Sequence, residues 1–317
     1  MALDLADYIP ALKFKKAQLK LNDLEGSGLF TFGNIYFVSS VTGSSVNAGN
    51  RPDKPVATVA QAIALCTANN DDVIVVLPGH AETVTATSID LNIAGVRIIG
   101  MGKGLKRPTF TYGAAAATIT VSAANCSWEN CHHIGNFLDV AAAFTLAAAK
   151  DFRLENNTFL DNTASLGFLS VLVTNATNNS ADGLTIVGNN WYGLDVSANA
   201  FISILANQNH AVITDNIVDM AATNDVGHFL TVAAKVVKNI RILRNVCTVV
   251  GVTTAAVGVF MTGSSTTNTG VMADNYCSSL DATTELFHTA ALGLACFNNR
   301  YTGALTAQGY LLPAVDA

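Results

Sequence analysis

The most constraining feature of this chain is a short apolar stretch that ends in asparagine and recurs along most of its length. The repeat asparagines are Asn130, Asn157, Asn190, Asn216, Asn245, Asn275 and Asn299. Counted from Gly100, which stands where an earlier turn belongs, the steps are 30, 27, 33, 26, 29, 30 and 24 residues. Such a period is typical of repeat architectures, in which each unit buries its apolar side against the next one.

A second apolar line precedes each asparagine. It begins at Ile119, Phe144, Phe168, Phe201, Phe229, Phe260 and Phe287. Two short strands per period, with no helical pattern between them, predict an all-β right-handed parallel β-helix of about seven to eight coils. Two places after each asparagine we expect an inward ladder of His132, Phe159, Tyr192, Val218, Cys247, Cys277 and Tyr301. The asparagines themselves suit tight turns and stacked amides that bond along the axis.

Four segments differ in character along the chain. Residues 1–34 form an N-terminal arm, and residues 35–83 contain a strand, a polar loop, a helix and a second strand. Residues 84–301 carry the coils, and residues 302–317 form a C-terminal tail that caps the last coil or contacts a neighbour. The spacing of apolar residues predicts the helix over residues 55–65, where it would cap the open N-terminal end of the solenoid.

Composition and charge exclude several classes of protein. The formal net charge is −6, whereas a nucleic-acid-binding domain usually shows a basic patch. The longest apolar runs are much shorter than the roughly 20 residues of a membrane span. The N-terminus lacks a basic segment followed by an apolar one, so we expect no signal peptide and synthesis in a cytoplasm. The six cysteines are accordingly expected to be reduced and mostly buried.

The stretch from residue 36 to residue 79 resembles a known family. The order of residues 36–38, the glycine-rich loop 43–52, the segment 54–63 and the strand 72–79 that ends in Pro78-Gly79 is similar to the opening of pectin-lyase-like β-helix proteins. Such openings are frequent in phage and prophage structural genes. The resemblance covers residues 35–301 and implies either sugar chemistry or a rigid building block, because one fold hosts many functions.

No familiar catalytic pattern of that family is complete in this sequence. The one Asp-Asp pair, Asp71-Asp72, precedes a strand near the cap, and Arg241-Ile242-Leu243 has leucine where a polygalacturonase-like site would have lysine. Asp215, Asp219, Asp225 and Asp274 are the nearest approach to the several oxygen ligands that calcium needs. We expect Asp215, Arg244 and Asp274 instead to form an outer ladder of charges. The prediction is no cofactor, no metal and no enzymatic activity.

Other candidate residues favour structural roles. Cys126, Cys131, His132 and His133 lack the paired spacing of a zinc site, and neighbours in a strand point to opposite faces. Cys247 and Cys277 are expected to stack in the core. His210, His228 and His288 have no evident nucleophile beside them, and residues 102–104 indicate a turn rather than a phosphate loop.

The resulting hypothesis is a bacteriophage virion protein, made in the host cytoplasm. It would be a homotrimeric cement or decoration protein on the head shell. Its arm would bind the major capsid protein through Leu5, Ile9, Leu12, Lys13, Lys15, Lys16, Leu19 and Lys20. The arm could alternatively be a helix folded back on the solenoid. The alternative function is a short tailspike that binds or degrades polysaccharide, with Trp128, Trp191, Tyr192, Tyr276 and Tyr301 as sugar-stacking candidates. A bacterial surface adhesin is a third possibility, disfavoured by the absence of an export signal.

Overall fold

Short strands with alternating burial stack in parallel along the whole chain. The computed structural model describes residues 31–221, 227–232, 235–249, 260–263, 267–279, 293–302 and 308–311. In β10 (Phe144–Leu146), Phe144 and Leu146 are buried and Thr145 is half-buried. Phe144 pairs in parallel with Ile119 of the preceding coil and with Leu172 of the following one. Since like residues then lie one above another, each coil buries its apolar side against its neighbours.

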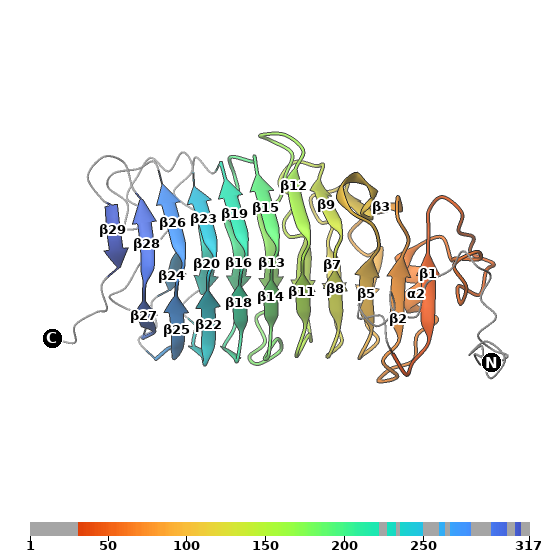
Figure 1. The fold of residues 1–317 in the computed structure, drawn as a ribbon, viewed down its shortest axis with the longest axis horizontal. Coiled ribbons are helices and arrows are strands. Elements are labelled where there is room, and N and C mark those ends of the chain that lie inside the picture. Colours follow the sequence, from red (N-terminus) through yellow and green to blue (C-terminus); the bar gives the residue numbers. More distant parts are fainter. Residues whose placement is uncertain are drawn as a thin grey trace, which may run out of the picture.

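Three long sheets run the length of the molecule, which is an elongated rod with the described strands side by side (Figure 1). Sheet A consists of β1 (Ile35–Val38), β2 (Val73–Val76), β5 (Arg97–Gly100), β8 (Ser127–Glu129), β11 (Arg153–Glu155), β14 (Thr185–Val187), β18 (Val212–Thr214), β22 (Ile240–Leu243), β25 (Gly270–Ala273) and β27 (Ala295–Phe297). Sheet C consists of β4 (Ile89–Leu91), β7 (Ile119–Val121), β10, β13 (Ser170–Thr174), β16 (Ala200–Ile204), β20 (His228–Val232) and β24 (Met261–Gly263).

Sheet B closes each coil. It consists of β3 (Ala81–Val84), β6 (Thr109–Tyr112), β9 (His132–Gly135), β12 (Thr158–Asp161), β15 (Asn190–Gly193), β19 (Ile217–Met220), β23 (Val246–Val249), β26 (Tyr276–Ser279), β28 (Asn299–Thr302) and β29 (Gln308–Leu311). β29 pairs antiparallel with β28, whereas the other strands pair in parallel. A minor pair is formed by β17 (Gln208–Asn209) and β21 (Val237–Lys238). The sequence predicted two strands per coil, and the structure has three.

The N-terminal end of the rod is closed by a short helix. Helix α2 (Val59–Ile63) is capped by Thr58, whose hydroxyl accepts from the Gln61 amide while the Gln61 side chain accepts from the Thr58 amide. Val59, Ala62 and Ile63 are buried in the core. The predicted helix over 55–65 is therefore shorter, because Thr58 begins it and Val56 before it pairs with Val38 of β1. A single turn of 3-10 helix, η3 (Gly104–Lys106), lies farther along.

Aromatic rings fill the interior and stack between coils. Phe229 lies between Phe201 and Phe260, with ring centroids 5.4 and 4.6 Å away. All three rings are fully buried. Such stacking adds stability beyond the burial of apolar area and fixes the register of successive coils. Among the described residues, no helix is long and apolar enough to cross a membrane.

Candidate functional site

A ladder of buried asparagines joins the coils at the turn between sheets A and B. Its members are Asn157, Asn189, Asn216, Asn245, Asn275 and Asn299. The Asn189 side chain donates to Asn216 Oδ1 at 3.1 Å, and its own Oδ1 accepts from the Asn157 backbone amide at 3.0 Å. Its Nδ2 also donates to the carbonyls of Leu154 and Val187. Each side-chain amide thereby satisfies buried backbone groups of the preceding coil, and unpaired groups of this kind would cost free energy.

Two repeat asparagines stand one residue away from this ladder. Asn130 adopts a left-handed φ of 57° and occupies the turn, so that Cys131 takes the ladder position and donates its amide to Asn157 Oδ1. Asn190 begins β15 after Asn189, because Gly188 supplies the left-handed turn residue in that coil. In each of these coils a left-handed turn residue is followed by the residue at the ladder position. This order explains why Asn130 and Asn190 lie one residue away from the ladder. A lone asparagine in the sequence does not say which of the two positions it fills.

The same shift changes which aromatic residues face inward. The register of sheet B aligns His133, Phe159, Trp191 and Val218, in place of the expected His132 and Tyr192. Trp128 and Trp191 are fully buried, so neither stacks on an external sugar. Tyr192 and Tyr276 are 44% and 36% exposed and point outward. Tyr301 packs against the core.

His133 is a buried imidazole within the aromatic stack. It lies between Phe110 and Phe159, at centroid distances of 5.6 and 4.8 Å. Its Nδ1 lies 3.1 Å from the Tyr112 hydroxyl, which donates to the Ala143 carbonyl. Burial lowers the pKa of His133 well below its ordinary value, since the charged ring would lose its hydration.

We expect the His133→Phe variant to lose part of the protein's acid sensitivity. Unfolded His133 titrates near 6.5, whereas the folded residue has a lower pKa and stays neutral. Protonation below about pH 6.5 therefore favours the unfolded chain, and the free energy of unfolding falls by up to about 1.4 kcal/mol per pH unit. Urea unfolding at pH 7 and pH 5 measures this loss, which the variant should lack. A His210→Asn control, at an exposed left-handed turn, should behave like the parent, and equal pH slopes for His133→Phe and the parent would refute the argument.

The other charged residues, cysteines and histidines that the sequence singled out either lie apart from one another or are paired with a neighbouring side chain. Arg244 donates to both oxygens of Asp215 at 2.7 Å on the surface, and this lowers the pKa of Asp215. Cys247 and Cys277 are buried register partners, and the described cysteines are free. His132 faces outward and His133 inward. No group of three His, Cys, Asp or Glu side chains in the described part of the chain is arranged to hold a metal ion.

A buried carboxylate that the sequence did not single out lies at the corner after sheet B. Asp161 Oδ1 accepts from the Phe168 amide and Oδ2 from the Asp195 amide, each at 3.0 Å. Burial raises the pKa of Asp161 to about 6. Gly167 makes room for it, since a Cβ there would lie 2.4 Å from the Asp161 carboxyl carbon. Asp195 is also buried, with one oxygen unpaired, and its pKa is raised by burial and by Asp139. Carboxyls with raised pKa values are candidates for acid–base chemistry.

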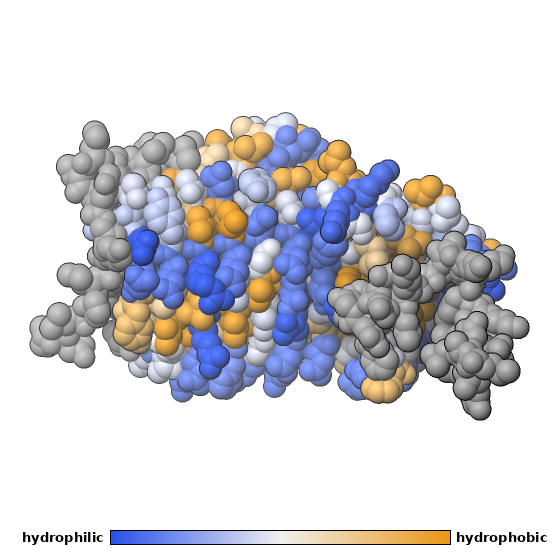
Figure 2. Space-filling view, in the orientation of Figure 1, coloured by the Kyte–Doolittle hydropathy of each residue, from blue (hydrophilic) through white to orange (hydrophobic). Residues whose placement is uncertain are grey.

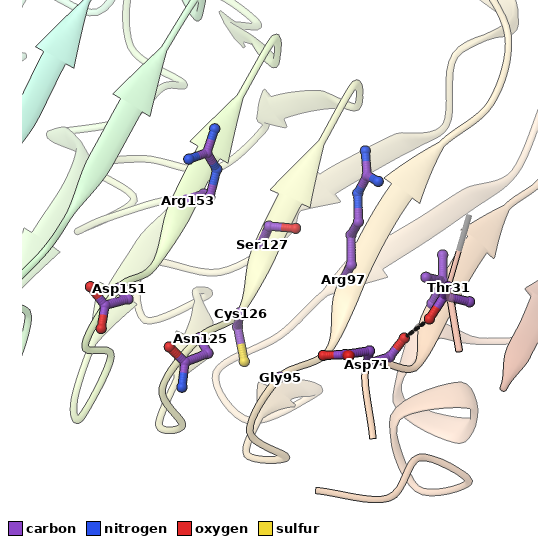
Figure 3. Close-up of a pocket in the computed structure, with 10 residues that line it drawn as sticks. Thr31, Asp71, Gly95, Arg97, Asn125, Cys126, Ser127, Asp151 and Arg153 are labelled. Atoms are coloured by element: carbon purple, nitrogen blue, oxygen red, sulfur yellow. Dashed lines mark hydrogen bonds between the residues drawn. The ribbon is translucent and has the colours of Figure 1, made fainter. Parts of the chain in front are cut away.

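A groove of about 410 Å³ lies at the N-terminal ends of strands β2, β5, β8 and β11 of sheet A, toward the N-terminal end of the rod. Turn residues Asp71, Asn125 and Asp151 line one side, and Arg97 and Arg153 rise from the strands on the other side (Figure 3). Arg97 donates to both oxygens of Glu129, at 2.8 and 2.6 Å, and Arg153 pairs with Glu155. The charges of both arginines are therefore balanced by glutamates of their own sheet. The carboxylates of Asp71 and Asp151 in the turns of the groove are not paired with these arginines.

The predicted capsid-binding residues, Leu5 to Lys20, lie outside the described residues, as do Asp225, Phe287, His288 and most of the C-terminal tail. Asp71 and Asp72 are described and have different roles. Asp72 is buried and accepts from the Asn34 and Thr67 amides at 2.6 and 2.7 Å. Asp71 adopts a left-handed φ of 55° and faces the groove.

Parallel pairing of successive coils in three sheets defines a parallel β-helix. Among solved structures, the chain is similar to a rhamnogalacturonan lyase, with 12% identity, a TM-score of 0.38 and coverage of 88% of this chain and 90% of the other. It is also similar to a GH136 lacto-N-biosidase from Eubacterium ramulus, with 9% identity, a TM-score of 0.41 and coverage of 90% and 70%. No protein-family model and no curated protein matches the chain.

These similarities correct one expectation. The sequence predicted a protein without enzymatic activity. That prediction is contradicted, because the similar solved structures are carbohydrate-active enzymes by their titles. At such low identity the similarity concerns the fold, and the lyase and biosidase activities belong to those proteins.

Proposed function

We propose that this chain is a structural protein of a bacteriophage particle, in which the β-helix is a rigid body mounted on the head shell as a cement or decoration protein. It would act as a homotrimer, with the major capsid protein as its partner and the virion as its location. The observation that carries the proposal is an outer apolar stripe on sheet B of a rod whose described interior is already filled by buried apolar side chains. The stripe consists of Ile217, Val246 and Tyr276, and Phe137, Leu138, Tyr192 and Leu194 are exposed on or after other strands of sheet B.

The stripe crosses β19, β23 and β26 of sheet B. Ile217, Val246 and Tyr276 are register partners on three successive coils, which makes them one continuous stripe. Figure 2 shows apolar patches, set in a hydrophilic surface, where Figure 1 draws β19 and β23. Contiguous apolar surface of this kind usually marks contact with another protein. A stripe parallel to the rod axis suits lateral packing of identical rods, as a symmetric oligomer requires.

Two measurements test the proposal. Light scattering should give a mass of three times 33.1 kDa in solution. Quantitative mass spectrometry of purified particles of the phage that encodes the chain should find hundreds of copies, in simple ratio to the major capsid protein. A handful of copies would point to a tail or vertex appendage, and absence from the particle would overturn the proposal.

A second candidate function is the binding of polysaccharide. It is supported by the exposure of Tyr192 and Tyr276, since outward aromatic rings can stack on sugar rings. Asp219 is the register partner of Tyr192, and Arg300 is that of Tyr276, so hydrogen-bonding groups adjoin both rings. Under this alternative, the Tyr192→Ala and Tyr276→Ala variants lose retention on host-envelope polysaccharide while their thermal unfolding is unchanged. Under the virion proposal, the same variants weaken the trimer.

A further inference from the structure

The outer side of sheet A carries a cluster of apolar side chains at its N-terminal end. The apolar face consists of Ile35, Phe37, Val73, Val75, Leu77, Ile99 and Met101. Phe37, Val75 and Ile99 form one row across β1, β2 and β5. In the next two coils that row continues with Glu129 and Glu155. The row is apolar again at Val187 in the following coil, so the two glutamates separate the N-terminal apolar cluster from the later coils.

Val73 and Val75 are only 3% exposed although they point away from the interior. Their strand neighbours Ile74 and Val76 point inward and belong to the main core, whereas the two outward valines form a separate cluster. The side chains grouped with them all come from sheet A or from residues directly after its strands. Side-by-side neighbours in a sheet leave the open side of a residue in contact with water. Burial this complete therefore indicates that the two valines at the centre of the face are covered from outside, whereas the other five side chains of the face are partly buried.

The groove described above adjoins this face and begins where the described chain begins. Val73 lines both, and Thr31 lines the groove and donates its hydroxyl to the Asp71 carbonyl. The 30 residues that precede Thr31 must therefore start from the mouth of the groove. On the far side of the groove, Asp71 and Asp151 present carboxylates that the sheet arginines do not pair with.

We propose that residues 1–30 cover the apolar face and lie along the groove of their own solenoid. Leu5, Ile9 and Leu12 are spaced to share one side of a helix, and this side would contact Phe37, Val75 and Ile99. The lysines that follow, Lys13, Lys15, Lys16 and Lys20, would lie near Asp71 and Asp151. Even a fully helical segment of this length spans about 45 Å at 1.5 Å per residue, which is more than the few strand spacings of about 4.8 Å to be covered.

This inference goes beyond the proposed function and stands without it. The inference has one consequence for the proposed function. A segment whose apolar side is held by its own solenoid cannot present that side to a capsid protein, so attachment to a shell would require release of residues 1–30 from the apolar face.

Limited trypsin digestion of the full chain tests the inference, with cleavage after Lys13, Lys15, Lys16 and Lys20 followed by mass spectrometry. In the parent protein these sites should be protected. The Ile99→Glu variant places a charge in the centre of the apolar face and should raise the cleavage rate about tenfold or more, because cleavage follows the population of the open state. Val187→Glu is the matched control, since Val187 occupies the same outward row three coils later, and it should leave the rate within about twofold of the parent.

A second variant removes the contact from the other side. Leu5→Ser combined with Ile9→Ser and Leu12→Ser leaves the solenoid sequence intact and should also expose the lysine sites, with unchanged aromatic near-UV circular dichroism. Equal cleavage in the parent and in both variants would overturn the inference. Protection that disappears on dilution, together with dissociation of an oligomer, would overturn it as well, because the covering segment would then come from a second copy.

Discussion

Replacing Asn189 with alanine is expected to lower the free energy of unfolding by about 3–5 kcal/mol, because several buried groups lose their partners at once. The carbonyls of Leu154 and Val187 lose a donor, and the Asn157 amide loses its acceptor. All of these groups lie inside the turn between sheets A and B, where water cannot replace the missing amide. Urea unfolding monitored by circular dichroism measures the loss.

The neighbouring asparagine provides the control. Asn190 is half-buried, begins β15 and pairs through its backbone with Thr158 and Ile217. Asn190→Ala should change stability by no more than about 0.5 kcal/mol, as for other surface substitutions. If the two variants lost equal stability, or if Asn190→Ala lost more, the ladder would not run through Asn189.

Truncation of Trp191 is the second large effect, with an expected loss of about 3–5 kcal/mol for Trp191→Ala. The indole is fully buried beside Phe201, with ring centroids 6.3 Å apart, and its Nε1 donates to Asp161 at 3.4 Å. The variant loses the burial of a large side chain and leaves a cavity that the paired coils cannot close, because their spacing is fixed by backbone hydrogen bonds. Thermal and urea unfolding at neutral pH measure the loss.

Tyr192→Ala is the matched control for that experiment. Tyr192 is the next residue and lies on the opposite face of the same strand, 44% exposed. Its truncation should cost less than about 1 kcal/mol. A larger loss for Tyr192→Ala than for Trp191→Ala would mean that β15 is paired one residue out of the register described here.

The buried Asp161 has a pH dependence opposite to that of His133. Its folded pKa of about 6 lies above the ordinary value of 3.8, so the folded protein takes up this proton first as pH falls. Stability associated with Asp161 therefore rises as pH falls from about 6 toward about 4, while His133 lowers stability below about pH 6.5. Comparison of His133→Phe with the parent separates the two contributions, since only the histidine contribution is removed.

The repeat of apolar stretches was sufficient to predict a parallel β-helix, because stacked coils are the arrangement in which short strands of that spacing bury their apolar sides. It also located the strands of sheets A and C and the stacked cysteines Cys247 and Cys277. The third strand of each coil was missed. Its outward positions include apolar residues such as Ile217 and Val246, so the alternation of apolar and polar residues is weak there.

Sequence alone thus determined the solenoid, its period and the turn chemistry of asparagine and glycine, since these follow from local spacing and backbone preference. The tertiary structure decided which of two adjacent residues faces the interior, as with Asn189 and Asn190 or Trp191 and Tyr192. It also brought Asp161 to the Asp195 amide, and Thr31 to Asp71, from positions 34 and 40 residues apart. The physical reason is that strand side chains alternate every residue, so one turn residue more or less reverses every face that follows. That choice is made by hydrogen bonds between coils and not by any single stretch of sequence.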